Sequence, residues 1–192
     1  MLPHARLVAV SQLLLFAKRR STALRVPLLL VVSAALLFLA PGTRAVAQIP
    51  DDIAAAQGEV PMVTIHAEGA QIYECKLDAG GKLAWQFREP IAALLIDGKT
   101  VGRHYAGPSW ELADSSLVKA KVAARAPGAT ATDIPLLKLE ITSQRGAGEL
   151  IGASTIQRIN TKGGVAEGVC EQAGSFLAVP YSADYVFFRK GG

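Results

Sequence analysis

The stretch LVKAKVAA, residues 117–124, decides the fold class, because its apolar and charged side chains alternate. Val118, Ala120 and Val122 fall on one side of an extended chain, and two lysines fall on the other. Successive side chains of a β-strand point to opposite faces of a sheet, so a period of two is typical of a half-buried strand. The stretch therefore predicts a strand with one apolar face and one solvated face.

The same pattern recurs along the chain in short runs that end at Gly, Pro or Asp. Helical periodicity is scarce, and residues 51–58 have room for a short helical turn at most. Repeated runs with turns about every eight to twelve residues predict an all-β domain, either an antiparallel β-sandwich or a closed β-barrel. The Asp97-Gly98 pair is a strong hairpin signal. The expected strands cover 62–66, 71–76, 83–88, 91–96, 100–105, 109–112, 117–124, 137–141, 150–161, 175–179 and 181–189.

Residues 1–47 have the features of a secretory signal peptide. Lys18-Arg19-Arg20 precedes the fifteen-residue apolar run 26–40, and Ala45-Val46-Ala47 supplies the small residues that a signal peptidase requires. A helix of that length rises about 22 Å, less than the roughly 30 Å hydrocarbon core. Cleavage after Ala47 is therefore expected, with a retained membrane anchor as the alternative. The mature protein would be a single all-β domain, residues 48–192, that is periplasmic or secreted.

The charge distribution excludes one class of partner. The chain has a net charge of +4, but all sixteen acidic residues follow residue 50 and six of the twenty basic residues precede residue 48. The expected mature chain thus has fourteen bases against sixteen acids, a net charge of −2. Nucleic-acid binding needs a basic face on the folded domain, so nucleic acid is excluded as a partner. A membrane is expected as a partner only through the leader during export.

Both cysteines, Cys75 and Cys170, follow the expected cleavage site. An even number of cysteines in an exported protein usually forms disulfides. A Cys75–Cys170 bond would close a loop of about 95 residues, which the chain-entropy model values at about 4–5 kcal/mol. A reactive or metal-binding thiol is the alternative, but no Cys-x-x-Cys motif is present, and His66 and His104 lack metal-ligand spacing. The prediction is a disulfide, with no metal and no cofactor.

Several motifs are shared with a known family. They are QIYEC (71–75), GRHYAGPSWE (102–111), IQRINTKGG (156–164), Cys170 and VPYSADY (179–185). In these motifs the chain resembles a family of uncharacterised exported proteins from bacteria and filamentous fungi, described as a domain of unknown function. The resemblance covers nearly all of the mature chain and implies no catalytic residues. Some fungal members are labelled malate dehydrogenase, but no Gly-x-Gly-x-x-Gly motif or strand–helix alternation supports that activity here.

The segment 103–111 is the strongest candidate for a functional site. It places a cation, an imidazole, a phenol, an indole and a carboxylate around a Gly-Pro bend. On a strand, Arg103 and Tyr105 face one way and His104 faces the other. Aromatic faces beside polar groups suit sugars or aromatic ligands. The alternative is a tight corner whose aromatic side chains only pack the core.

Two sets of candidate residues follow. An imidazole beside a carboxylate can act as acid or base near neutral pH, so His104 with Glu111 or Asp184 is the candidate catalytic pair. Asp184 is also expected to form a buried ion pair with Arg158. The ligand-binding candidates are Arg103, Tyr105, Trp110, Arg158, Asn160, Tyr181 and Tyr185, although Asn160 suits a turn and the tyrosines suit sheet packing.

Three functions remain open for such a protein. The leading hypothesis is a non-enzymatic binding or envelope-associated module, because no Gly-x-Ser-x-Gly motif and no complete phosphate loop is present. One alternative is an enzyme that acts on a carbohydrate or small ligand, and the other is a calyx-type barrel that holds an apolar molecule. The expected partner is a small molecule or glycan, and the sequence leaves the oligomeric state open.

Overall fold

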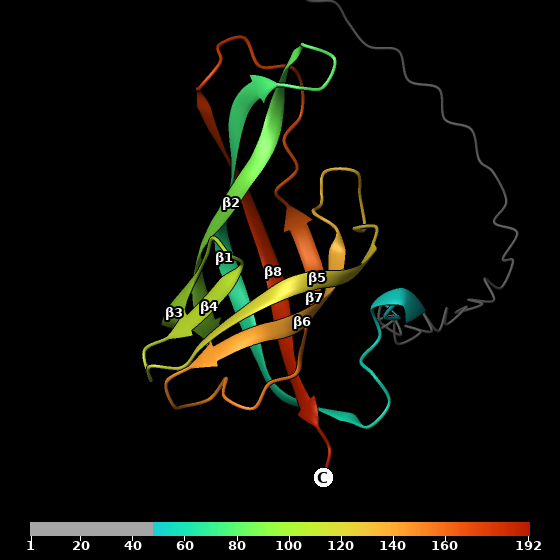
Figure 1. The fold of residues 1–192 in the computed structure, drawn as a ribbon, viewed down its shortest axis with the longest axis vertical. Helices are drawn as coiled ribbons and strands as arrows, with labels where there is room; N and C mark the ends of the chain where they lie inside the picture. The colour runs from blue at the N-terminus through green and yellow to red at the C-terminus, as the bar shows by residue number, and fades with distance from the viewer. Residues whose placement is uncertain (1–47) are drawn as a thin grey trace, which may run out of the picture. The chain divides into compact units, whose positions relative to one another are not determined.

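The computed structural model describes residues 48–192, and the predicted signal peptide, residues 1–47, lies outside them. The described chain forms one antiparallel sheet of eight strands, each paired with its neighbours in sequence. The first and last strands also pair, so the sheet closes into a barrel and not a sandwich (Figure 1). The all-β prediction is confirmed. The strands are β1 (Glu59–Leu77), β2 (Leu83–Ile96), β3 (Lys99–Tyr105), β4 (Ser109–Leu112), β5 (Leu117–Ala126), β6 (Leu136–Arg145), β7 (Thr155–Gly163) and β8 (Phe176–Lys190).

A single 3₁₀ turn, η1 (Asp51–Ile53), precedes the barrel in the described chain. Ile53 is fully buried, and its carbonyl oxygen accepts a hydrogen bond of 2.6 Å from Nε2 of Gln157 on β7. The turn thus attaches the start of the domain to the barrel wall. Between residues 48 and 192, no helix is long and apolar enough to cross a membrane.

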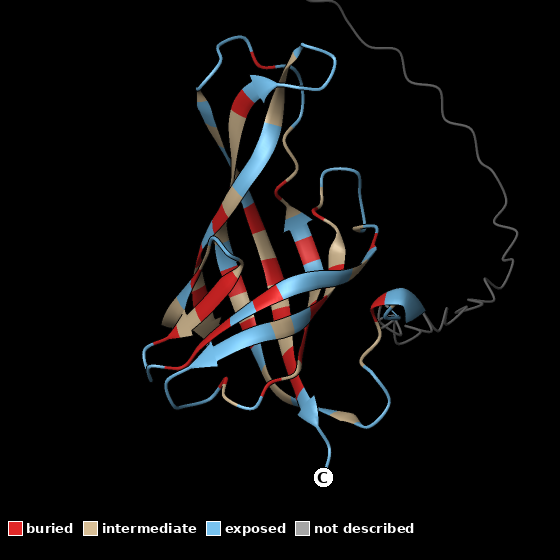
Figure 2. Cartoon of the chain, viewed as in Figure 1, coloured by how far each residue is buried: buried red, intermediate tan, exposed pale blue. Residues whose placement is uncertain are grey.

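The alternating pattern of the sequence sets the inside and outside of the barrel, as the burial colours show (Figure 2). In β5, Val118 and Ala120 are buried in the core, whereas Lys119 and Lys121 are exposed. Each buried Val, Ile or Leu contributes about 1.5–3 kcal/mol, so a shift of one residue in register would lose the whole core face. Val122 has the same inward orientation but remains 38% exposed, because it lines an opening into the barrel.

Several strand boundaries differ from the prediction, three of them for a reason that the backbone shows. β1 continues through Gly69, where the sequence pattern predicts a break between two runs. A Cβ atom at Gly69 would lie 2.1 Å from the carbonyl oxygen of Ile91, so this glycine permits a close approach of β1 to β2. β2 likewise continues through Pro90, which pairs with Gln71 beside a register shift of β1. β7 begins at Thr155 and not at residue 150, because the preceding segment is a glycine-rich loop with positive φ angles.

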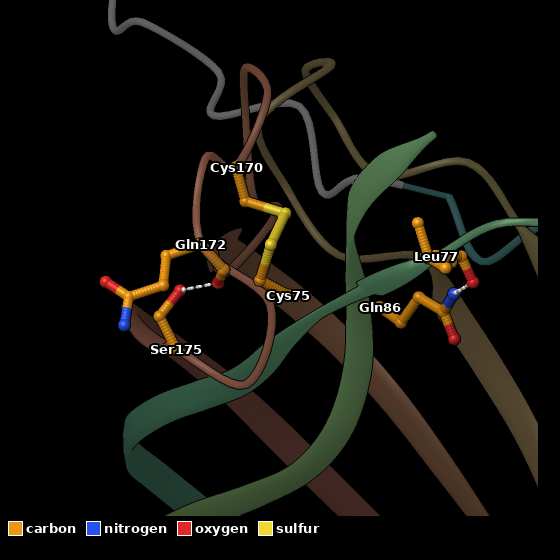
Figure 3. Close-up of a disulfide and its surroundings, with 6 residues drawn as sticks. All are labelled: Cys75, Leu77, Gln86, Cys170, Gln172 and Ser175. Carbon is orange, nitrogen blue, oxygen red and sulfur yellow. Dashed lines mark hydrogen bonds between the residues drawn. A yellow bond between two sulfur atoms is a disulfide. The ribbon is translucent and has the colours of Figure 1, made fainter. Parts of the chain in front are cut away.

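The predicted disulfide joins Cys75 of β1 to Cys170 of the loop between β7 and β8, with 5.8 Å between the Cα atoms (Figure 3). The same loop returns to β1 through backbone hydrogen bonds from Cys75 to Ser175 and from Gly174 to Cys75, both 2.9 Å. Ser175 Oγ also donates to the carbonyl oxygen of Gln172. The cross-link therefore anchors a long loop to the end of β1.

Candidate functional site

A cavity of about 420 Å³ lies inside the barrel wall. Its lining comes from all eight strands and from the turn between β3 and β4. The lining residues fall into an aromatic group, an aliphatic group and a small polar group. The aromatic group includes His104, Trp110 and Tyr185. The aliphatic group includes Val122, Leu137 and Leu139, and the polar group includes Gln71, Arg88, Arg125 and Arg158.

The aromatic wall is built by the β3–β4 hairpin, in which His104 and Trp110 are paired across the two strands. Their rings stack at a centroid distance of 4.4 Å and an angle of 16°. Tyr185 of β8 lies edge-on to Trp110 at 5.2 Å and also contacts the His104 ring at 5.1 Å. All three side chains are at least 97% buried, so this wall is rigid and screened from bulk water.

The protonation state of His104 follows from its contacts. Its Nδ1 lies 2.8 Å from the carbonyl oxygen of Ser109. A carbonyl oxygen only accepts, so Nδ1 carries the proton and Nε2 keeps a lone pair. Burial lowers the pKa of His104 to about 4, the Ser109 hydrogen bond opposes that shift, and the positive charge of Arg158 adds to it. The imidazole is therefore neutral at pH 7 and acts as one donor and one acceptor.

Three residues of the cavity lining carry a buried polar atom without a hydrogen-bond partner within the described chain: Gln71 (Nε2), Trp110 (Nε1) and Tyr185 (the hydroxyl). Tyr181 and Arg158 lie close to the Tyr185 hydroxyl, but neither forms a hydrogen bond of ordinary geometry with it. Burial raises the pKa of Tyr185, so the phenol stays protonated and keeps its donor. A buried polar group without a partner lowers the stability of the fold by about 1–3 kcal/mol. An acceptor supplied by a molecule in the cavity would remove that loss.

The charged residues that line the cavity are Arg88, Arg125 and Arg158, and no carboxylate is among them. Arg158 is half-buried, and its Nε and Nη2 both donate to the Pro135 carbonyl oxygen, at 3.1 and 2.8 Å. Arg88 is exposed and lies 3.1 Å from a carboxylate oxygen of Glu89. The cavity wall is thus positive on balance.

The outer face of the β3–β4 hairpin carries a separate polar cluster. Arg103 donates to Oε2 of Glu111 through Nε and Nη2, at 3.0 and 2.8 Å, and the Tyr105 hydroxyl donates to the same oxygen at 3.0 Å. The Arg103 hydrogen bond is the main cause that lowers the pKa of Glu111. Glu111 is therefore an ionised carboxylate whose Oε2 accepts three hydrogen bonds, on the side of the sheet opposite to His104.

Asp184 also lies on the outside of the barrel. Its Oδ1 is 2.7 Å from Nδ1 of His66, and its Oδ2 accepts a 2.7 Å hydrogen bond from Nδ2 of Asn160. The expected buried ion pair between Arg158 and Asp184 is wrong. Arg158 pairs across the strands with Tyr185 and faces the cavity, and the neighbouring Asp184 faces outward because successive side chains of β8 alternate.

Comparison with protein families identifies the chain. The model of the family described as "Protein of unknown function (DUF3455)" matches residues 55–100 and 95–189, which together cover well over half of the chain. The chain belongs to the DUF3455 family. Searches of curated proteins and of solved structures found no match.

In this DUF3455 protein the candidate residues divide into three groups. His104, Trp110, Arg158 and Tyr185 come together on the cavity wall. Tyr181 is buried in the core next to them, outside the lining. Arg103, Tyr105, Glu111, Asn160 and Asp184 form the two outer clusters, so neither candidate catalytic pair of His104 with a carboxylate is brought together.

Sequence reasoning missed Gln71 of the DUF3455 cavity, although its position carried a usable signal. Gln71 follows Ile65, Ala67 and Gly69 at intervals of two, so it continues the inward face of β1. A polar side chain on an apolar face is an informative exception, because a buried amide needs hydrogen-bond partners. No group of three or more His, Cys, Asp or Glu residues suited to a metal ion occurs between residues 48 and 192.

Proposed function

We propose that this protein is an exported small-molecule-binding protein whose ligand occupies the barrel cavity. The observation that carries the proposal is that three residues of the cavity lining, Gln71, Trp110 and Tyr185, each hold a buried donor without a partner in the described chain. The cavity that these residues line has a volume of about 420 Å³. Small-molecule sites are typically apolar cavities of about 300–1,000 Å³ with a few polar groups that fix orientation.

The geometry favours binding over acid–base catalysis. His104 is neutral and its Nδ1 proton is held by Ser109, so one nitrogen is already committed to the backbone. Glu111 and Asp184 are bound to other side chains on the outer surface. General acid–base catalysis needs the two groups within reach of one substrate, and the barrel wall separates them.

Export to the periplasm or cell exterior forms part of the proposal. It is supported by the signal-peptide pattern of residues 1–47 and by the Cys75–Cys170 disulfide, because disulfides persist in oxidising compartments. Material recovered from the culture medium or periplasm should begin at Gln48 by N-terminal sequencing. Recovery of the uncleaved chain in the membrane fraction would contradict this part of the proposal.

The binding proposal is tested with N-phenyl-1-naphthylamine, a neutral aromatic probe whose fluorescence rises in apolar surroundings. The purified protein should bind about one molecule of the probe per chain in a saturable titration. Val122→Trp places a large ring at the opening, on a side chain that is already 38% exposed, so folding should be preserved. We expect the variant to bind about tenfold more weakly or worse, which corresponds to a loss of about 1.4 kcal/mol.

The matched control is Lys121→Trp, the adjacent residue of β5, whose side chain is 68% exposed on the outer face. It adds the same ring to the same strand without entering the cavity, so probe affinity should stay within about twofold of the unmodified protein. Absence of saturable binding, or equal weakening by the two substitutions, would overturn the proposed function.

A further inference from the structure

The position of Arg158 shows where a ligand would meet a positive charge. Arg158 stands opposite Tyr185 in the β7–β8 register, and both side chains line the cavity. Two of its nitrogens share one acceptor, the Pro135 carbonyl oxygen, which fixes the guanidinium plane. A guanidinium has five N–H donors, so donors remain after this contact.

The charge of Arg158 is not neutralised by a carboxylate in the described chain, in which the ion pairs involve Lys76, Arg88, Arg103, Lys121 and His66 as cations. Arg125, also on the cavity lining, has no ion pair there either. Removing a cation from water without a counter-ion is unfavourable, and Arg158 is half-buried. An anion in the cavity would supply the missing partner.

The remaining wall defines the other part of the ligand. Leu137 and Leu139 are buried and aliphatic, and the rings of His104 and Trp110, which stack on each other, add aromatic side chains to the lining. Such a lining favours an apolar group, because burial of apolar surface is worth about 25 cal/mol per Å². The cavity lining therefore combines a positive charge at Arg158 with apolar side chains.

We infer that the ligand is a small organic acid, with an apolar body against the aliphatic and aromatic lining and one carboxylate against Arg158 and the Tyr185 hydroxyl. The inference rests on the proposed function and adds the chemical class of the ligand. The unpartnered donors of Gln71 and Trp110 accommodate further oxygen atoms on the same molecule. Charge-assisted hydrogen bonds are about twice as strong as neutral ones, so the carboxylate dominates recognition.

The test uses 2-naphthoate and 2-naphthamide, which share one ring system and differ in the charge of a single substituent. Isothermal titration calorimetry at pH 7 should show naphthoate binding about tenfold or more tightly than naphthamide. Arg158→Gln should remove that preference by weakening naphthoate about tenfold, with naphthamide and the neutral probe N-phenyl-1-naphthylamine changed less than about twofold. Retained binding of the neutral probe shows that the variant is folded and its cavity open.

Arg125→Gln is the matched control, because Arg125 also lines the cavity but is exposed to solvent. Its removal should weaken naphthoate less than about threefold, since exposed charges are screened by water and salt. Equal affinity for the two naphthalene compounds, or no naphthoate binding by a protein that binds the neutral probe, would overturn the inference alone. Failure of the neutral probe to bind would instead overturn the proposed function, and the inference with it.

Discussion

The two faces of the β3–β4 hairpin carry residues that are neighbours in sequence but have opposite chemistry. On the inner face, the His104 ring stacks on Trp110, both nearly free of solvent. On the outer face, Arg103 and Tyr105 share the Glu111 carboxylate, and Arg103 is largely in water. A single linear motif is therefore divided by strand alternation into a dry, neutral wall and a wet, charged cluster.

The difference lies in which groups remain available for binding. In the outer cluster the charged groups bind one another, because Glu111 Oε2 already accepts from both Arg103 and Tyr105. The inner wall differs, because Trp110 Nε1 has no partner within the described chain and His104 Nε2 keeps its lone pair. Polar side chains on a surface are most often solvated, whereas an unpaired donor in a cavity indicates a site for a ligand.

The largest test of this contrast compares the adjacent residues Trp110 and Glu111. Trp110→Ala should lower the free energy of unfolding by about 3–5 kcal/mol, because it deletes a large, fully buried side chain from the core. Glu111→Ala should leave the urea midpoint nearly unchanged, since its ion pair lies on the surface. Urea unfolding followed by far-UV circular dichroism measures both. Similar losses for the two variants would show that the inner and outer faces are not distinct.

The next prediction concerns the pH dependence of the free energy of unfolding. The expected change is smaller, and it is specific to His104. Its pKa is about 4 in the folded chain against 6.5 for an exposed imidazole. Above pH 6.5 the ring is neutral in both states; below it, only the unfolded chain takes up the proton. The free energy of unfolding should therefore fall as the pH falls from 6.5 toward 4, by about 1.4 kcal/mol per unit at most and about 3 kcal/mol in total.

The matched variant for this prediction is His104→Phe, which keeps an aromatic ring against Trp110 and removes the titrating group. Its stability should vary less between pH 6.5 and 4 than that of the unmodified protein. Carboxylates with lowered pKa, such as Glu111 and Asp114, lose their contribution in both proteins and cancel in the difference. Parallel curves for the two proteins would mean that His104 takes up protons in the folded state.

Strand alternation explains how much of this arrangement is predictable from the sequence. A period of two is enough to put Arg103 and Tyr105 on the face opposite to His104. The same local reasoning identifies the hairpin at Asp97-Gly98, where both residues have positive φ. These features depend only on the local backbone geometry of a few consecutive residues, so they can be predicted from the residue types at those positions.

Contacts between strands could not be predicted in the same way. Register decides that Arg158 faces Tyr185, and register shifts between Ile159 and Lys162 break any simple count along β7. The convergence of Gln71 with His104 and Arg158 depends on closure of β1 against β8, which joins residues more than a hundred positions apart. The expected pairing of Arg158 with Asp184 is wrong because Arg158 stands opposite Tyr185 in the register, so that the adjacent Asp184 lies on the other face of the sheet.

The smallest expected effect concerns the outer cluster alone. Arg103→Gln removes the hydrogen bonds that chiefly hold down the pKa of Glu111, so that pKa should move upward toward the ordinary value for glutamate. Carboxyl carbon chemical shifts followed by NMR across a pH titration report it directly. Arg88→Gln is the control, because Arg88 neighbours Glu74 and Glu89, so its substitution should leave the pKa of Glu111 unchanged.

The same Arg103 variant should bind 2-naphthoate as the unmodified protein does, because Arg103 lies outside the cavity lining. A weakened naphthoate affinity would show that the two faces of the hairpin are coupled, and the separation drawn between them would be wrong.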